Sequence, residues 1–509
     1  MTLKTKTVNN AIWSAAGFIL PLILFLATTP YYEEKLGASQ FGILFLVLTI
    51  IGYFSIFDIG FSSATLKYLS EYIGKRDNEQ MKKIINGSFT VYLTLGILGS
   101  LVIFLSVNFI VDKLFKIDKE YIEVSKFAFY VASFAFTFKM LSTIFNALIR
   151  AFQRYDLTTK IGIVFSTANL MGGFFLLYLG FGLRAIIIWY FLLICLQFPV
   201  FIVISRRLFP EFSIHLRIEK DILKILFNFS WPAFISSVSG MLLFQLDKAF
   251  IGAMLSMAAV TFYTIPAEIS IKIHSFIASF SHVIFPLSSE LNAKGDKLRL
   301  QHLYFKSSQI VIMIATSVAA PLLVFSDKII YLWMGSDFAS NTGFVFPVLL
   351  ISYYVVIFTI VPYFFLNGFG RPRVNAIYSF YSFVLNIIAC LILIPKYRIN
   401  GAAIATLIGM LQVPFYLRAF HKISGFSISQ LLSKIFSKIW LTGLIQFIII
   451  KFLLYNSVNG KISLLVVLTI SFAIFYVLFI LFSFYDEEDK NLVLSYIPHF
   501  LLPKGRRII

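Results

Sequence analysis

The sequence has little charge and almost no cysteine. Charged residues make up 13% of the 509 residues, whereas a soluble domain has about 25%. Both cysteines, Cys195 and Cys390, lie inside apolar runs, so the sequence indicates neither a disulfide framework nor a metal site. A mean hydropathy of +0.87 leaves no room for a large water-soluble domain. The composition therefore predicts an all-α polytopic membrane protein.

Signatures of nucleotide chemistry are also missing. The sequence has no P-loop and no DxD pair in a loop, so nothing marks an ATPase or a nucleotide-sugar enzyme. Membrane polymerases and ligases that act on lipid-linked sugars generally need a sizeable outer loop with charged catalytic groups. The longest predicted outer loop, Ser326 to Gly343, offers only Asp327, Lys328 and Asp337. We therefore expect no enzyme and no cofactor.

The net charge of +19 does not indicate a nucleic-acid partner, because the basic residues lie in short loops between apolar runs. With the N-terminus inside, 29 of the 43 Lys and Arg residues fall in cytoplasmic segments and 10 on the opposite side. This bias places both termini in the cytoplasm, next to anionic lipid headgroups. The first apolar run has no small-residue cleavage site, so we interpret it as a permanent helix.

Apolar runs of about 20 residues match a hydrocarbon core of about 30 Å. The sequence contains about fourteen such runs, and an even number agrees with two cytoplasmic termini. The predicted spans are 9–30, 41–62, 84–111, 121–148, 159–181, 183–205, 228–253, 261–287, 305–326, 343–368, 374–395, 400–420, 436–456 and 462–484.

One polar stripe runs through the apolar segment from Thr261 to Pro286. At helical spacing it contains Glu268, Lys272, Ser275, Ser279 and His282, all on one face. A charge near the bilayer centre costs roughly 3 kcal/mol, so such residues usually face a bundle interior or a water-filled cavity. Two interpretations stay open: a Glu268–Lys272 pair that seals a helix interface, or a face that lines the path of a polar substrate.

The second and fourth spans carry further polar residues. Asp58 lies toward the cytoplasmic end of its span, where it fits an interfacial cap as well as a role in a lumen. The fourth span has Lys139, Thr143, Asn146 and Arg150 on one face, descending to the cytoplasm. Arg150 reaches water by snorkelling, whereas Lys139 lies deeper.

Two later spans also carry candidates. Asp247 and Lys248 are adjacent, about 100° apart on a helix, so one side chain is expected to face the lumen and the other a neighbouring helix. Tyr363 and Asn367, four residues apart, face the same way in the tenth span.

Together these residues predict a hydrated cavity with cationic character. Clustered lysines suit a diphosphate, which carries several negative charges. The buried acids could titrate or hold a coupling cation, because desolvation disfavours a charged carboxylate. The candidate diphosphate ligands are Lys272, Lys139, Lys248 and Arg150, and the candidate coupling acids are Glu268, Asp247 and Asp58.

A weak internal repeat appears when the sequence is shifted by 219 residues. Ser70-Glu71 then falls on Ser289-Glu290, and Asp77 falls on Asp296. Copies of six spans have the same orientation, so they would be related by an axis along the membrane normal. The predicted division is an N-terminal lobe, 1–210, a C-terminal lobe, 211–434, and two extra helices with a cytoplasmic tail, 435–509.

An ordered set of motifs resembles the Wzx-type polysaccharide flippases of the multidrug/oligosaccharidyl-lipid/polysaccharide (MOP) exporter superfamily. The first half has Asn10-x-x-Trp13, Leu36-Gly37-Ala38-x-x-Phe41-Gly42, Phe57-Asp58-Ile59-Gly60-Phe61 and Ser70-Glu71-Tyr72. The second half has Trp231-Pro232, Asp247-Lys248, Tyr263-x-Ile265-Pro266 and Pro286-x-Ser288. The resemblance covers roughly residues 8–420, in order.

The resemblance implies two six-helix lobes around a central cavity with alternating access. The substrate would be a polyprenyl-diphosphate-linked oligosaccharide for O-antigen (lipopolysaccharide), capsule or exopolysaccharide assembly, flipped to the outer leaflet of a bacterial plasma membrane. Membrane lipids, and polysaccharide polymerase or chain-length proteins, would be the partners of a monomeric transporter. The first span has no charge between Lys6 and Glu33, unlike lipid II flippases of this superfamily, which makes Lys272 the nearest functional counterpart.

Two other hypotheses remain. A multidrug or organic-cation antiporter of the same architecture predicts an acid-dominated cavity, whereas the lysines of this chain should repel a cation. A membrane polymerase or ligase would change the length or linkage of the glycan, whereas a flippase changes only the leaflet.

Overall fold

The computed structural model describes residues 3–54, 61–211, 214–216, 224, 227, 246–281 and 284–482. Helices joined by short connections make up these ranges, and no strand occurs in them. The all-α prediction is confirmed. The chain divides into two compact units: a first unit of residues 1–272 and 372–411, and a second unit of residues 273–371 and 412–509.

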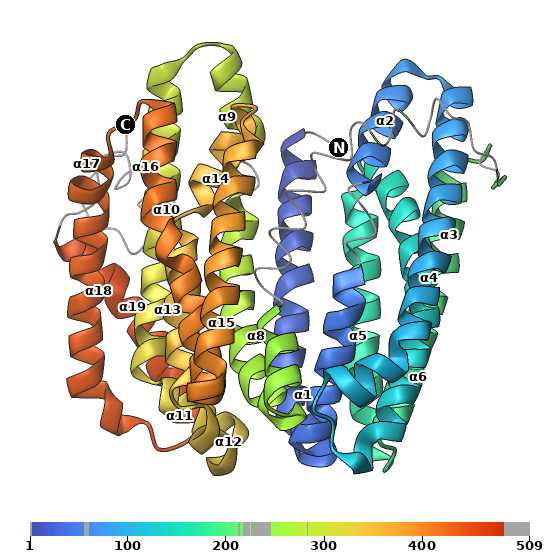
Figure 1. Cartoon of the computed structure of the whole chain (residues 1–509). Helices are drawn as coiled ribbons and strands as arrows, with labels where there is room; N and C mark the ends of the chain where they lie inside the picture. Colours follow the sequence, from blue (N-terminus) through green and yellow to red (C-terminus); the bar gives the residue numbers. More distant parts are fainter. Residues whose placement is uncertain are drawn as a thin grey trace. The chain divides into compact units, whose positions relative to one another are not determined.

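Six helices form most of the first unit (Figure 1): α1 (Leu3–Phe54), α2 (Phe61–Lys75), α3 (Asn78–Phe109), α4 (Ile122–Ala151), α5 (Tyr155–Tyr178) and α6 (Leu183–Leu208). The helical residues 246–254, the first part of α8 (Met257–Ser281) and all of α15 (Pro372–Gly409) complete it.

The second unit holds the remaining helices. These are the end of α8, α9 (Ile284–Ala293), α10 (Lys297–Val324), α11 (Ser326–Met334), α12 (Ser336–Thr342), α13 (Val345–Ile357), α14 (Ile360–Gly368), α16 (Val413–Ser424), α17 (Ile428–Gln430), α18 (Ser437–Ile449) and α19 (Lys461–Leu481). Short π-helical turns lie at Leu431–Phe436 and Ile450–Leu454, on either side of α18.

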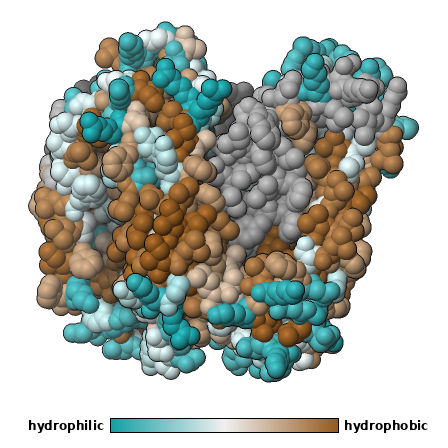
Figure 2. All heavy atoms as spheres, viewed as in Figure 1, coloured by the Kyte–Doolittle hydropathy of each residue, from teal (hydrophilic) through white to brown (hydrophobic). Residues whose placement is uncertain are grey.

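Within the described ranges, ten helical stretches are long and apolar enough to cross a membrane. Figure 2 shows hydrophobic side chains along the middle of the helices and hydrophilic ones at the helix ends. The stretches are Ile19–Gly52, Asn78–Leu114, Lys119–Ala151, Tyr155–Tyr178, Leu183–Leu208, Lys297–Val324, Val345–Gly368, Pro372–Ser424, Ile428–Ser457 and Lys461–Leu481. The chain is a multi-pass membrane protein.

Two of these stretches contain a break at the place where the sequence predicts a loop between spans. In α1, Gly37 has a φ of +72°, a left-handed conformation that suits glycine. In α15, Arg398 has a φ of +54° and separates the predicted spans 374–395 and 400–420. The total of fourteen spans stays a prediction, because residues 228–245 lie outside the described ranges.

The first unit is built on close packing of α2, α3, α4 and α6, and of α1 on α5. Large side chains such as Tyr92, Phe136 and Phe145 are fully buried between these helices. Gly42 lets α1 approach the start of α8, because a Cβ at this position would lie 1.9 Å from the carbonyl oxygen of Met257. Gly37 and Gly42 therefore shape α1 and its contact with α8.

In the second unit, α10 packs against α13, α18 and α19. The side-chain amide of Gln446 in α18 donates to the carbonyl oxygens of Ser317 in α10 and Ser471 in α19, at 3.3 and 2.8 Å. The predicted outer loop from Ser326 to Gly343 is instead helical over α11 and α12, which Gly335 separates with a φ of +93°.

The turn between α2 and α3 matches the turn between α9 and α10 at a constant offset of 219 residues. The Asp77 carboxylate accepts from the backbone N–H three residues later at 3.0 Å, and the Asp296 carboxylate does the same at 3.1 Å. Arg76 and Gly295, which precede these caps, both have positive φ, +56° and +69°. The repeat seen in the sequence therefore extends to backbone conformation.

The same offset relates two exposed ion pairs at the ends of α2 and α9. Lys75 donates to Glu71, and Lys294 donates to Glu290, so each lysine pairs with the glutamate four residues before it. In both pairs the hydrogen bond from the lysine lowers the pKa of the glutamate carboxyl below its usual range.

A second pair of turns repeats at an offset of 217. Gln153 follows α4 and Gly370 follows α14, with φ of +58° and +71°. The backbone N–H groups of Arg154 and Arg371 each reach the carbonyl oxygen five residues back. The two halves thus share both turns. The stretch between the two turns is two residues shorter in the second half than in the first.

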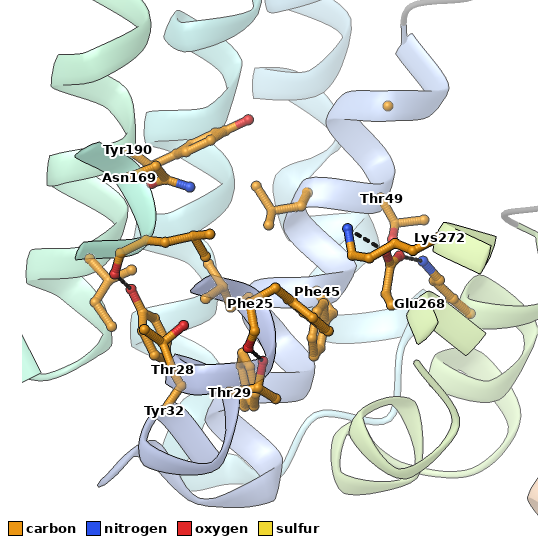
Figure 3. Close-up of a pocket in the computed structure, with 17 residues that line it drawn as sticks. Phe25, Thr28, Thr29, Tyr32, Phe45, Thr49, Asn169, Tyr190, Glu268 and Lys272 are labelled. Carbon is orange, nitrogen blue, oxygen red and sulfur yellow. Dashed lines mark hydrogen bonds and ion pairs between the residues drawn. The ribbon is translucent and has the colours of Figure 1, made fainter. Parts of the chain in front are cut away.

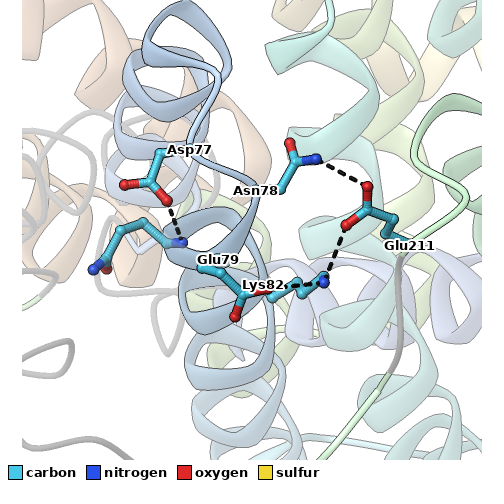
Figure 4. A network of polar contacts seen from close by, with 6 residues as sticks. Asp77, Asn78, Glu79, Lys82 and Glu211 are labelled. Atoms are coloured by element: carbon cyan, nitrogen blue, oxygen red, sulfur yellow. Dashed lines mark hydrogen bonds and ion pairs between the residues drawn. The ribbon is translucent and has the colours of Figure 1, made fainter.

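A chain segment docks on α3 just after α6 ends (Figure 4). Glu211 accepts from the side chains of Asn78 and Lys82, at 3.0 and 3.1 Å, and the His215 N–H donates to the Asn86 side chain at 2.9 Å. The positions 219 residues after Lys82 and Glu211 are Gln301 and Gln430, both in the second unit. Their side chains also form a contact, in which the Gln301 amide donates to Gln430 at 3.4 Å.

Candidate functional site

A cavity of about 390 Å³ lies in the first unit; we call it the Lys272 pocket. Its walls come from α1 on both sides of the Gly37 break, from α5 and α6, and from the helices that carry Lys248 and Glu268. The charged and polar residues that line it are Thr28, Thr29, Tyr32, Thr49, Asn169, Tyr190, Lys248, Glu268 and Lys272.

Three charged side chains meet in this pocket. Lys248 Nζ donates to Glu268 Oε1 over 2.9 Å, and Lys272 Nζ lies 3.9 Å from Glu268 Oε2. Lys248 is almost fully enclosed, with 4% of its side chain exposed, whereas Lys272 is 28% exposed. With all three groups ionised, the cluster carries one net positive charge.

Lys272 points into the open part of the pocket. Its ammonium lies 5.0 Å from the centroid of the Phe25 ring, within range of a cation–π interaction. Figure 3 shows Lys272 and Glu268 on one side of the pocket, with Asn169 and Tyr190 on the opposite side. An anion that enters would meet the Lys272 amine and a wall of hydroxyl, amide and aromatic groups.

Asp247 faces away from the pocket, as the angle of about 100° between adjacent helical residues requires. Its carboxylate oxygen Oδ2 accepts from the hydroxyls of Tyr263 in α8 and Thr406 in α15, at 2.6 and 2.8 Å. The Cys390 thiol contacts Oδ1 at 3.6 Å. Asp247 and Lys248, although adjacent in sequence, therefore have different surroundings, and the role of each stays a prediction.

A second cavity of about 260 Å³ lies between α2, α4 and α6; we call it the Lys139 pocket. Lys139, Thr143, Asn146 and Arg150 all line it, so the stripe predicted for the fourth span faces one pocket. The structure therefore separates the predicted cations into two pairs: Lys248 with Lys272, and Lys139 with Arg150.

The other candidates lie elsewhere. Ser275 is half-buried in α8, and the exposed Ser279 donates to the carbonyl oxygen of Phe276. In the second unit, Tyr363 is 40% exposed and Asn367 lies one helical turn further along α14. The remaining two candidates, Asp58 and His282, lie outside the described residues.

Sequence reasoning did not select the polar residues that α1 brings to the Lys272 pocket. The hydroxyls of Thr28 and Thr29 donate to carbonyl oxygens one turn earlier, and Tyr32 donates to the Leu170 carbonyl at 3.0 Å. Thr28 and Tyr32 are four residues apart, so the same helical-spacing rule could have identified them.

The described residues hold no group of three or more His, Cys, Asp or Glu side chains that could bind a metal ion. Both cysteines are free thiols. The described lining of the two pockets therefore offers amines, the Arg150 guanidinium, hydroxyls, amides and aromatic rings, together with the Glu268 carboxylate.

Two relatives of this chain are named as a transporter and a flippase. It is 20% identical over 409 residues to a protein of Shigella flexneri named "Putative O-antigen transporter", covering 78% of this chain and 93% of the relative. It is 26% identical over 391 residues to the "Probable low-salt glycan biosynthesis flippase Agl15" of Haloferax volcanii, covering 75% and 76%.

Solved structures share the fold. A lipid II flippase MurJ in an inward closed conformation superposes with a TM-score of 0.76 at 16% identity, covering 93% of this chain and 98% of the other. An inward-facing multidrug resistance MATE family transporter of the MOP superfamily gives a TM-score of 0.70 at 16% identity, covering 80% and 94%.

These similarities confirm the resemblance to Wzx-type transporters of the MOP superfamily. A family model described as "Polysaccharide biosynthesis protein" matches residues 36–342, which is more than half of the chain. The chain belongs to this polysaccharide biosynthesis protein family.

Proposed function

We propose that this protein is a flippase for lipid-linked glycans and not an enzyme. Its substrate would be a polyprenyl-diphosphate-linked oligosaccharide repeat unit, moved from the cytoplasmic to the outer leaflet by alternating access. The observation that carries this proposal is the Lys272 pocket, where two amines share a single carboxylate. The relatives named as an O-antigen transporter and a glycan biosynthesis flippase support the same substrate class.

In this mechanism the diphosphate competes with Glu268 for the two lysines. Hydrogen bonds to ionised groups contribute about 1.5–3 kcal/mol each, so an incoming diphosphate can replace the weaker contact, the 3.9 Å approach of Lys272 to Glu268. The Lys248 contact, at 2.9 Å and enclosed, would persist longer. Glu268 thus acts as an internal counter-ion that the substrate partly displaces.

The sugars would bind the polar and aromatic wall of the pocket. Tyr32, Asn169 and Tyr190 offer hydroxyl, amide and ring surfaces of the kind that bind carbohydrate. The prenyl tail would remain in lipid. Access would switch by rocking of residues 1–210 against residues 211–434, the two halves defined by the sequence repeat, with Ser275, Ser279, His282, Tyr363 and Asn367 as further cavity contacts.

An ion gradient would drive the return step through Glu268, Asp247 or Asp58. Protonation of Glu268 would free both lysines, so proton binding and anion binding at this pocket favour each other. Asp247 has a different setting, since its carboxylate is held by hydroxyl groups away from the pocket. This makes Asp247 the better candidate for an ion site that is separate from the substrate.

We place the transporter in a bacterial plasma membrane with both termini in the cytoplasm, following the distribution of Lys and Arg. Polysaccharide polymerase or chain-length proteins would act on the product, and one chain would suffice for transport.

The test is flipping of a fluorescent lipid-linked oligosaccharide by proteoliposomes that contain wild-type protein or the Lys272→Gln variant. We expect at least a tenfold slower rate, because the variant loses the exposed amine. Lys126→Gln is the matched control: Lys126 lies near the start of α4 and pairs with Asp112 at 2.9 Å, outside both pockets. A wild-type rate for Lys272→Gln across the pH range would remove Lys272 from the mechanism.

A multidrug or organic-cation antiporter is the second candidate, favoured by the fold shared with the MATE transporter and by an acid inside the pocket. Uptake of a cationic dye, lost in Glu268→Gln, would support this function. The net positive charge of the cluster argues against it.

A further inference from the structure

The Lys139 pocket contains two cations that do not reach the Lys272 pocket. Lys139 and Arg150 line it from α4. Between and around them are neutral hydroxyl and amide groups, from Ser62, Ser63, Ser142, Thr143, Asn146 and Gln197. These groups can donate hydrogen bonds to an anion without adding charge. The pocket thus has the composition of an anion-binding site.

No acid neutralises this pocket within the part of the chain that the structure describes. Its described lining contains no Asp or Glu, and neither Lys139 nor Arg150 forms an ion pair with a described residue. Arg150 lies 5.6 Å from the centroid of the Tyr155 ring, a contact that orients the guanidinium and supplies no formal negative charge. In the Lys272 pocket, by contrast, an anion must compete with Glu268.

The two cations are stacked along one helix. They are eleven residues apart, or three turns of α4, which places them on one face about 16 Å apart along the axis. A diphosphate group is shorter than this separation. It would therefore contact Arg150 and Lys139 in succession, with Thr143 and Asn146 between them.

We propose that the Lys139 pocket is a second phosphate-binding site, which captures the diphosphate at Arg150 and passes it to Lys139 before the Lys272 pocket receives it. The identity of the ligand rests on the proposed function, but the site rests on its own geometry. The planar guanidinium of Arg150, at the predicted cytoplasmic end, suits bidentate capture of a phosphate. Lys139, deeper in the span, provides a point charge that the anion can leave more readily.

The first test counts binding sites for inorganic pyrophosphate by titration calorimetry on the purified full-length protein in a neutral detergent. We expect two sites per chain. The double variant Lys139→Gln/Arg150→Gln should lose one of them, with at least tenfold weaker binding, and keep the other. The double variant Lys248→Gln/Lys272→Gln should show the reverse pattern, and Lys126→Gln should retain both sites.

The retained site shows that each double variant is folded. If Lys139→Gln/Arg150→Gln keeps two sites of wild-type affinity, the second site does not exist, whereas the Lys272 pocket and the proposed function would stand. If wild type shows one site, and only Lys248→Gln/Lys272→Gln removes it, the second site likewise does not exist and the proposed function stands. If only the Lys139 site binds pyrophosphate, the inference holds and the proposed role of the Lys272 pocket fails.

A kinetic split distinguishes capture from a structural role. In proteoliposomes, Arg150→Gln should raise the apparent KM for the lipid-linked substrate at least fivefold with little change in kcat. Lys139→Gln should lower kcat instead, because the substrate is captured but advances slowly. Equal losses of kcat in both variants with unchanged KM would overturn the sequence of two contacts.

Phosphate could also come from an anionic membrane lipid. The same calorimetric titration in nanodiscs of neutral phosphatidylcholine, and in nanodiscs with phosphatidylglycerol, separates the two sources. If the site is kept for the substrate, phosphatidylglycerol should leave pyrophosphate binding at the Lys139 pocket unchanged. A loss of this binding in phosphatidylglycerol nanodiscs would assign the pocket to a resident lipid headgroup and overturn its role in capture.

Discussion

Replacing Glu268 by glutamine tests whether this carboxylate is a counter-ion that competes with the substrate. The substitution keeps the shape of the side chain and removes its negative charge. Lys248 and Lys272 lie 2.9 and 3.9 Å from the carboxylate oxygens. At an effective dielectric constant of about 20, the attraction between unit charges at the longer distance is about 4 kcal/mol, an upper limit for a partly hydrated group.

Without the Glu268 charge, an anion no longer has to displace this attraction, so its binding free energy becomes more favourable by a fraction of it. We expect Glu268→Gln to bind inorganic pyrophosphate about 10- to 100-fold more tightly than wild type at the Lys272 pocket, equivalent to about 1.4–2.8 kcal/mol. Tighter binding of the ground state should slow release, so the flipping rate should fall. The assay is calorimetric titration combined with flipping measured in proteoliposomes.

The pH dependence provides an internal check. Protonation of Glu268 removes the same charge as the substitution, so wild-type affinity should rise as the pH falls and approach that of Glu268→Gln. Protonation of pyrophosphate itself changes its binding to both proteins alike, so this effect cancels in the difference between the two affinities. Weaker or unchanged binding by Glu268→Gln at neutral pH would refute the counter-ion reasoning, because Glu268 would then contribute to the site by some other contact.

Two further predictions concern the scaffold. Gly42→Ala should lower the thermal unfolding temperature, because the new Cβ would lie 1.9 Å from the Met257 carbonyl oxygen and overpacking costs about 1–3 kcal/mol. Gly162→Ala is the control and should leave this temperature unchanged, because its Cβ would have no atom within 4 Å. Equal melting curves for the two variants would refute this reasoning. We expect cleavage of the segment that contains Glu211 to become faster in wild type as salt is added, because salt weakens its ion pair with Lys82. Glu211→Gln should speed this proteolysis and remove its salt dependence. Salt dependence that persists in Glu211→Gln would mean that another contact holds the segment.

Helical spacing predicted contacts along one helix but not contacts between helices. It placed Glu268 and Lys272 on one face, and it required Asp247 and Lys248 to face different surroundings, as the structure shows. The closest partner of Glu268 is nevertheless Lys248, from the preceding helix. The rotation and depth of two neighbouring helices depend on side-chain packing, which one sequence does not specify.

The separation of the cations has the same origin. Lys139 and Lys272 are both deep and basic, and from sequence alone they belong to one cationic cavity. Lys139 instead faces α2 and α6, which are packed closely with α4, while α1 and α5 form the wall of the Lys272 pocket. Helix pairing in a membrane is set by small residues and shape, and the hydrophobic pattern carries little information about it.

The repeated docking contacts on the N-terminal ends of α3 and α10 differ in one respect. The first joins Lys82 to Glu211, and the second joins Gln301 to Gln430 at the corresponding positions. An ion pair at the surface weakens as mobile ions accumulate, whereas a contact between two amides is nearly indifferent to them. Raising the salt concentration should therefore weaken the Lys82–Glu211 contact more than the Gln301–Gln430 contact, so we expect the two repeats to differ in how firmly these chain segments are held when the ionic strength changes.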